Sequence, residues 1–273
     1  MVLRLFPKQH LPVLIPLIRI KNNPKYWRFW NPYQYPFSAV AYNYFDLTKK
    51  QLGIFRGASL RKALKIQSDV IFVQVGITRD DILYIYPLQH YLRNAVLMGA
   101  HIIVQPDFSI YLDDRPSWRL GQILKNHEKQ QQCIEYLRKL GVNPHNTFVP
   151  IVIGTNRKEV EKSFRLATSE GFGVLAFNAG FWLRIGYMKN IYAFLNLCED
   201  YEIVPVILNA GFRSLYKISS RYGSVIHITH FFVWEGIRQG IDSPCIIREL
   251  LERAIKKMRQ FYQPVISDYH GGR

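Results

Sequence analysis

The chain has 273 residues, 48% of them hydrophobic, which is enough for a sizeable core and excludes an intrinsically disordered protein. Lysine and arginine outnumber aspartate and glutamate by 36 to 20, and this formal charge of +16 predicts a polyanionic partner, with nucleic acid the first candidate. Three widely spaced cysteines fit neither a metal site nor a disulfide framework, so we expect a cytoplasmic protein without metal or cofactor.

The first apolar segment, residues 11–17 (LPVLIPL), is too short to cross a membrane and contains two prolines. We therefore expect a buried strand there and no membrane association. An aromatic and cationic stretch follows at residues 25–36 (KYWRFWNPYQYP). Its rings could stack on unpaired bases or cover one end of the fold, and covering is favoured because so many rings cannot all face water.

Seven further apolar, β-branched segments read as strands buried on both faces. They are residues 37–45, 69–76, 100–107, 147–154, 172–178, 202–209 and 224–230. Helical patterns separate most of them, at residues 59–65, 88–98, 118–140, 156–168, 183–200, 213–221 and 243–262. Strands alternating with helices form a parallel sheet, and eight strands predict an α/β fold of the (β/α)₈ TIM-barrel type. An open, doubly wound sheet is the alternative.

We expect one barrel domain over residues 1–273, because no flexible linker or block of charges divides the chain. Within it, residues 1–36 supply the first strand and an irregular aromatic loop. Residues 244–262 supply the C-terminal helix. The N-terminal segment is the irregular part of this scheme, because no clear helix separates the first two strands.

The sequence Asn-Ala-Gly-Phe occurs twice, at residues 178–181 and 209–212, each time at the end of a predicted strand. In a barrel the carboxyl ends of the strands and the loops after them form the reactive face, so Asn178 and Asn209 should lie there on adjacent strands. Each glycine is expected to let the chain turn sharply. The asparagines could contact a ligand, or the repeat could be a duplicated turn that asparagine caps.

Other polar residues near strand ends complete a candidate site. Asp107 is the only acidic residue among those ends, and it could act as a nucleophile or general base, or brace the loop that follows. His230 could transfer a proton near neutral pH, whereas a core position suits His227 better. Amides can bond the edge of a base and aromatic rings can hold its face. The substrate-binding candidates are Gln74, Phe108, Asn178, Phe181, Trp182 and Asn209.

Cationic side chains recur on the last two predicted helices. A solvated helix face is the default interpretation, but the two helices would form a phosphate-binding strip if they share a side. The nucleic-acid-binding candidates on them are Arg213, Lys217, Arg221, Arg253, Lys256 and Lys257.

Three segments of the second half follow one another in a recognisable order. They are FVPIVIGTNRKEVEKSFRLATSEGFGVLAFNAG (148–180), PVILNAG (205–211) and SVIHITHFFVWEGIRQG (224–240). Together they resemble the tRNA-guanine transglycosylase superfamily, over roughly the last half of the chain. The resemblance implies a (β/α)₈ barrel that exchanges a guanine-type base in tRNA or DNA through an aspartate nucleophile.

The chain also departs from that family. Where the family has its nucleophilic aspartate, on the last strand, this sequence has Thr229 and His230. The zinc-binding cysteine cluster and the Asp-Ser-Gly-Gly motif are missing. A shorter segment, QPDFSIYLDDRPSWRLGQ (105–122), resembles the PDFS segment of uncharacterised phage and plasmid proteins, which implies a mobile-element origin.

We therefore predict a basic barrel protein that acts on nucleic acid, with base exchange by a transglycosylase-like transferase as its specific form. Asp107 and His230 are the catalytic candidates. A non-catalytic nucleic-acid-binding protein on a degenerate barrel is the first alternative, and the missing last-strand aspartate favours it. A barrel enzyme for a small phosphorylated metabolite is the second alternative.

Overall fold

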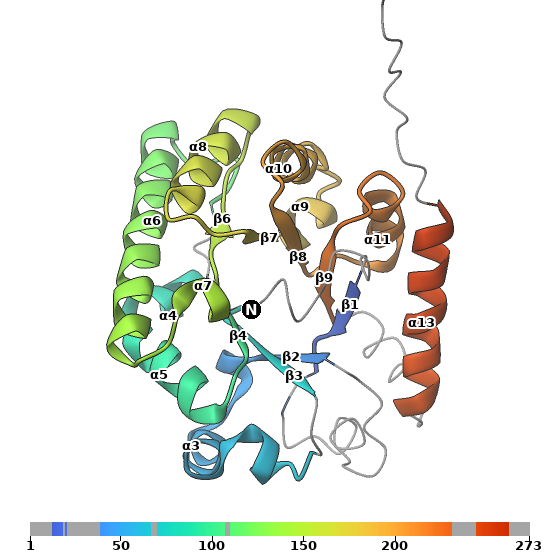
Figure 1. Ribbon diagram of the computed structural model, residues 1–273. Helices are drawn as coiled ribbons and strands as arrows, with labels where there is room; N and C mark the ends of the chain where they lie inside the picture. The colour runs from blue at the N-terminus through green and yellow to red at the C-terminus, as the bar shows by residue number, and fades with distance from the viewer. Residues whose placement is uncertain are drawn as a thin grey trace, which may run out of the picture.

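The computed structural model of this protein describes residues 13–18, 20, 39–66, 70–106, 110–230 and 244–261. In these ranges every strand pairing is parallel, and helices surround the strands (Figure 1). The strands are β1 (Val13–Pro16), β2 (Ala39–Asn43), β3 (Ile71–Val75), β4 (Ile102–Val104), β5 (Phe148–Val149), β6 (Ile151–Val152), β7 (Val174–Asn178), β8 (Val204–Leu208) and β9 (Ile226–Thr229). The predicted mixed α/β class with parallel sheets is confirmed.

Helices follow most of the strands. They are the short 3₁₀ helix η4 (Tyr44–Asp46), α3 (Lys49–Ala63), α4 (Asp80–Ile85), α5 (Leu88–Met98), α6 (Pro116–Lys139), α7 (Pro144–Thr147), α8 (Arg157–Thr168), α9 (Gly180–Arg184), α10 (Lys189–Asp200), α11 (Phe212–Ser219) and α13 (Pro244–Phe261). Within the described ranges, none of these helices combines the length and the apolar character needed to cross a membrane.

The strands are arranged in two sheets that meet at two places. One sheet has the order β1-β9-β8-β7-β6, and the other has the order β2-β3-β4-β5. Strands β5 and β6 are successive parts of one segment, divided at Pro150, which has no N–H to donate to a neighbouring strand. At the other junction, Leu17 forms a parallel bridge with Ala41, and Ile18 N donates to Ala41 O at 2.9 Å.

Alternate residues along the strands enter two different apolar clusters. In β3, Val73 and Val75 belong to a cluster formed by strand residues of both sheets. Phe72, which precedes Val73, belongs to the larger cluster that the strands form with the surrounding helices. Both faces of the strands are therefore apolar, which explains why the strands appear in the sequence as continuous hydrophobic runs.

Every predicted strand is found, but two helices differ from the prediction. The helix predicted over residues 183–200 is divided into α9 and α10, and α3 begins ten residues earlier than the sequence pattern indicated. Helix α3 begins at Lys49 instead of residue 59. Two glycines within it, Gly53 and Gly57, weaken the helical signal. The signal that could have located its start is the capping box of Thr48 and Gln51, in which each side chain bonds the main-chain N–H of the other residue.

Candidate functional site

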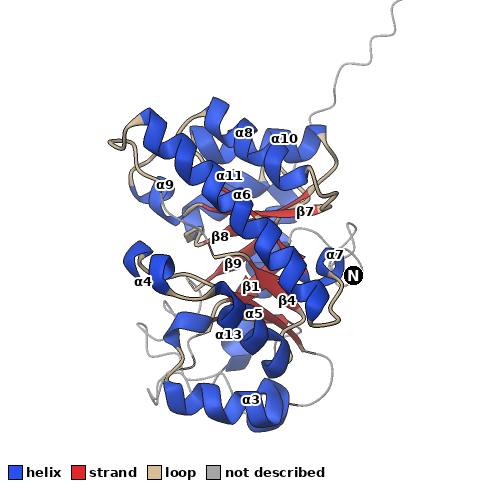
Figure 2. Cartoon of the chain, turned by 90° about the vertical axis from the view of Figure 1, so that its left-hand side faces the viewer, coloured by secondary structure: helices blue, strands red, loops and turns tan. Residues whose placement is uncertain are grey.

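The carboxyl ends of the parallel strands lie on one side of the molecule. The short helices α4 and α9, which follow the carboxyl ends of β3 and β7, project on this side (Figure 2). The loops that follow β4 and β8 begin at the same edge, because paired parallel strands end together. Residues that follow any of these strands can therefore contribute to one site.

The two asparagines of the repeated sequence are hydrogen-bonded to each other at this edge. Asn209 Nδ2 donates to Asn178 Oδ1 at 3.1 Å, and Gly180 N donates to the same oxygen at 3.3 Å. Both side chains are half-buried. The expectation that the two residues lie close together on adjacent strands is confirmed, and Asn178 also closes the turn into α9.

The glycines of the repeat do not have the role expected of them. Neither Gly180 nor Gly211 has a positive φ, whereas Asn209 does, at 61°, a conformation that asparagine tolerates better than most residues. A Cβ on Gly180 would lie 2.9 Å from the Cβ of Asn209, so glycine is needed there for the close approach of the two turns. A Cβ on Gly211 would meet nothing within 4 Å.

Aromatic rings lie next to the asparagine pair. The half-buried ring of Phe181 makes edge contacts with Tyr111, at 5.3 Å between centroids, and with Trp182, at 5.0 Å. Trp182 is buried in the core, whereas Tyr111 is 38% exposed. The sequence analysis did not identify Tyr111, although its place four residues after Asp107, in a loop after a strand, was a usable signal.

A half-buried ion pair anchors the loop that carries Tyr111. Arg119 Nε donates to Glu159 Oε1 at 2.9 Å, and the two side chains are 13% and 16% exposed. Arg119 also donates to the main-chain oxygens of Leu112 and Asp114. Glu159 Oε2 accepts from both N and Oγ1 of Thr155, at 2.9 and 2.8 Å. The pair therefore joins the loop after β4 to the residues that follow β6.

The surroundings of Glu159 keep its carboxyl group ionised. Burial alone would raise the pKa of this group, but the two hydrogen bonds from Thr155 and the guanidinium of Arg119 outweigh it, so the pKa lies below its usual value. Arg119 and Glu159 are 40 residues apart in sequence, and nothing in the local patterns predicted their contact.

The other predicted site residues are distributed over different parts of the chain. Asp107 and Phe108 lie outside the described residues. His230 is exposed at the end of β9. Gln74 is fully buried, and its amide accepts from Tyr42 Oη at 2.9 Å and donates to the main-chain oxygen of Tyr91 at 3.2 Å. Gln74 therefore lies on the helix-facing side of its strand and away from the asparagine pair.

His227 occupies a core position, as expected, and its partner is a hydroxyl group. Its Nε2 lies 3.1 Å from Ser219 Oγ, which in turn lies 3.1 Å from Met258 Sδ. Its Nδ1 has no hydrogen-bond partner among the described residues. Complete burial lowers the pKa of His227 to about 3, so the ring is neutral.

Helices α11 and α13 lie side by side and in contact (Figure 1). Lys257 Nζ lies 5.3 Å from the centre of the Tyr216 ring, across the contact between the helices. Arg221 lies over the rings of Tyr192 and Tyr222. We call the exposed cations of the two helices and the turn after α11 the α11–α13 strip. Its members are Arg213, Lys217, Arg221, Arg253, Lys256 and Lys257.

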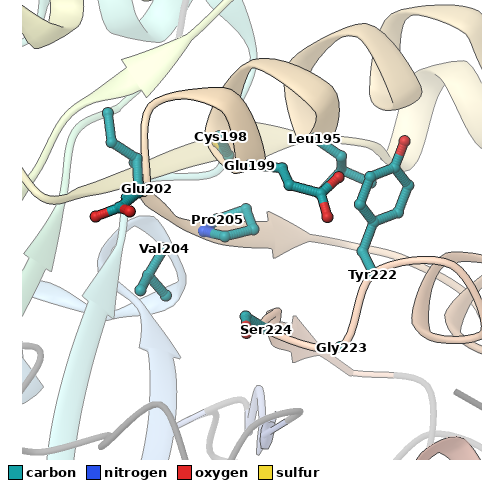
Figure 3. Close-up of a pocket in the computed structure, with 10 residues that line it drawn as sticks. Leu195, Cys198, Glu199, Glu202, Val204, Pro205, Tyr222, Gly223 and Ser224 are labelled. Atoms are coloured by element: carbon teal, nitrogen blue, oxygen red, sulfur yellow. The ribbon is translucent and has the colours of Figure 1, made fainter. Parts of the chain in front are cut away.

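A pocket of about 200 Å³ lies at the opposite end of β8 (Figure 3). Val204 and Pro205, the first residues of that strand, line it together with Glu199 and Tyr222. Because Asn209 follows the last residue of the same strand, this pocket is separate from the asparagine pair. It forms no part of the candidate site.

The described residues contain no group of histidine, cysteine, aspartate and glutamate side chains that could hold a metal ion. No protein-family model matches the sequence, and no curated protein matches it.

Proposed function

We propose that this protein is a single-domain (β/α)₈ barrel that binds nucleic acid. Closure of the ring is supported by the two junctions between the sheets, at Pro150 and at the bridge between Leu17 and Ala41. It is also supported by the apolar cluster that takes residues from all nine strands of the two sheets. With β5 and β6 counted as one interrupted strand, the ring has the eight strands of this fold.

The observation that carries the functional proposal is the α11–α13 strip. Five of its six exposed cations lie on two helices in contact, and Arg221 lies in the turn after α11, whereas α11 has no carboxylate and α13 has only Glu249 and Glu252. Arg253 pairs with Glu249 at 3.4 Å, but both side chains are exposed to solvent, so a phosphate group can replace that carboxylate. The excess of cations on this face attracts phosphate groups, and the chain's net charge of +16 favours the same partner.

Neutralising part of the strip should weaken binding, because fewer phosphate groups would be paired with a cation. For Lys217→Gln/Lys256→Gln, the slope of log K against log salt should become shallower by about 0.9 for each duplex phosphate that is no longer neutralised. The measurement is fluorescence anisotropy of a labelled oligonucleotide, single-stranded and duplex, at several salt concentrations. The matched control is Lys158→Gln/Lys162→Gln on α8, an exposed pair interspersed with carboxylates. Absence of salt-dependent binding by the unaltered protein would contradict the proposal.

Base exchange is the specific reaction proposed for the carboxyl ends of the strands. Asp107 would attack the sugar carbon and displace the base, and His230 would assist proton transfer. The asparagine pair would contact the edge of the base, and Phe181 with Tyr111 would hold its face. The reaction type is supported by the family resemblance, and the place of the base by the hydrogen bond between Asn178 and Asn209. The choice of Asp107 rests on its position at the end of a predicted strand, because the family's own aspartate position holds Thr229 and His230 here.

Replacing Asp107 with asparagine should abolish exchange and preserve binding. We expect incorporation of labelled guanine into tRNA or DNA to fall about a thousandfold or more, because a nucleophile would be lost. Binding should change by less than about twofold. Unchanged exchange would remove Asp107 from the mechanism. Salt-dependent binding without any exchange by the unaltered protein would support the non-catalytic alternative, which Thr229 and His230 at the position of the family's aspartate already favour.

A further inference from the structure

Helix α3 carries cationic side chains and contains no carboxylate. Residues 47–66 include six cationic side chains and no carboxylate. Arg61 is used internally, since it donates to Val70 O at 3.1 Å and lies over the ring of Phe72. The other five are exposed, and none forms an ion pair within the described ranges. We call them the α3 cationic face: Lys49, Lys50, Arg56, Lys62 and Lys65.

The composition of this helix works against its own stability. Lys49 and Lys50 occupy the first turn, where the helix dipole disfavours cations. Ser59 interrupts the helix with a φ of 59°, a conformation that is uncommon for residues other than glycine. Gly53 and Gly57 lie within the helix and are exposed, and a Cβ on either would meet nothing within 4 Å.

Packing does not explain why glycine occupies these two positions, because a Cβ at either one would meet no atom within 4 Å. A segment that breaks several local rules without a gain in packing is expected where a function requires it. Exposed glycines would let a phosphate backbone approach the helix closely, and the lysines on either side would bind its charges. The exposed glycines and the exposed lysines therefore favour the same ligand, a phosphate backbone.

We infer that the α3 cationic face is a second phosphate-contacting surface for nucleic acid, an inference that rests on the proposed function. Helix α13 contacts β1, β1 contacts β2, and α3 follows β2, so β1 and β2 connect the elements that carry the two cationic surfaces. A long nucleic acid can then contact both surfaces, whereas a short one contacts one of them.

A membrane surface suits this helix less well. Helices that lie on membranes present a broad apolar face outward. In α3 the apolar residues Phe55 and Leu60 are buried in the protein core, and Ile54 is the large apolar side chain that is exposed. The polyanion expected here is therefore nucleic acid.

The experiment compares Lys62→Gln/Lys65→Gln with the control Lys158→Gln/Lys162→Gln on α8. On a long duplex, the α3 variant should make the salt slope shallower by about 0.9 for each phosphate that is no longer neutralised, and it should weaken binding about tenfold at low salt. The control should leave both quantities unchanged. Combined with Lys217→Gln/Lys256→Gln, the losses of affinity should add on a long duplex.

The outcomes separate this inference from the proposed function. If the strip variant changes the salt slope and the α3 variant does not, the α3 inference is overturned and the proposed function stands. If the α3 variant loses binding only to vesicles of anionic lipid, the face is a membrane contact and the inference is also overturned. If the unaltered protein binds no nucleic acid, both proposals fail together.

A glycine variant tests the inference through nucleic-acid binding, which would not change if the glycines of α3 served only the fold. Gly53→Ala/Gly57→Ala should raise the melting temperature, because alanine favours the helix at both positions. The same variant should bind a long duplex at least about threefold more weakly, since the added methyl groups keep the backbone away from the helix. Higher stability with unchanged binding would contradict the role given to the glycines.

Discussion

Replacing His227 with leucine should remove an acid-induced loss of stability of about 3 kcal/mol between pH 7 and pH 4. In the folded protein, burial lowers the pKa of this histidine from 6.5 to about 3. Below pH 6.5 the unfolded chain takes up a proton that the folded chain does not. The free energy of unfolding therefore falls as the pH drops from 6.5 toward 3.

The contacts of His227 explain why a proton cannot be accommodated. Ser219 Oγ, the hydrogen-bond partner of the ring among the described residues, carries no negative charge to balance an imidazolium. The ring lies on β9, Ser219 lies on α11, and Met258 Sδ, which accepts from Ser219, lies on α13, so protonation would disturb the packing between these elements.

The measurement is urea unfolding at pH 7, 5 and 4 for the unaltered protein and the variant. At pH 7 the variant should lose about 1 kcal/mol with the hydrogen bond to Ser219. His90→Gln, at an exposed position on α5, is the control for removal of a histidine elsewhere in the chain. A variant that loses stability with acid as steeply as the unaltered protein would show that another group is responsible.

The order and spacing of the strands could be predicted from the sequence for a physical reason. Strands apolar on both faces produce continuous hydrophobic runs, and these runs are hard to confuse with amphipathic helices. Capping residues predicted where several helices begin or end equally well. Asn156 accepts from Glu159 N at the start of α8, and Gly99 ends α5 in the left-handed conformation.

Because the strands are apolar on both faces, the sequence does not show which way a polar residue on a strand faces. Gln74 lies in a run without alternation, so the sequence could not tell whether its amide faces the helices or the other side of the sheet. Its bond with Tyr42 joins residues 32 positions apart. The register of β2 against β3, which places Tyr42 opposite Gln74, follows from the whole sheet and from no local signal.

The asparagine pair was only partly predictable. Its placement on adjacent strands follows from the repeat and the parallel order. The hydrogen bond, however, depends on the positive φ of Asn209 and on the close approach at Gly180, both of which come from the packing of neighbouring turns. The repeated sequence therefore does not produce two equivalent turns.

Replacing Arg119 with methionine should destabilise the protein by about 2–4 kcal/mol at pH 7, because it leaves the carboxylate of Glu159 half-buried without its cation. The two bonds from Thr155 remain, so the carboxyl group stays partly satisfied. The loop with Tyr111 would also lose the donors that hold its main-chain oxygens.

The pH dependence of this variant distinguishes loss of the ion pair from loss of packing. The pKa of Glu159 is lowered in the folded protein, so its contribution to stability is present above its usual value of 4.5 and is lost as the pH falls through the folded value. The difference between Arg119→Met and the unaltered protein should therefore shrink in acid, as measured by urea unfolding at pH 7 and pH 3.

The chain contains a matched control for this pair. Arg165 and Glu161 on α8 form an ion pair at 2.7 Å that is exposed to solvent. Arg165→Met should change the free energy of unfolding by less than about 0.5 kcal/mol, because water screens such a pair. Equal effects of the two substitutions would mean that Arg119 does not anchor the loop after β4. A larger effect of Arg119→Met that is the same at both pH values would place its contribution in packing instead of charge.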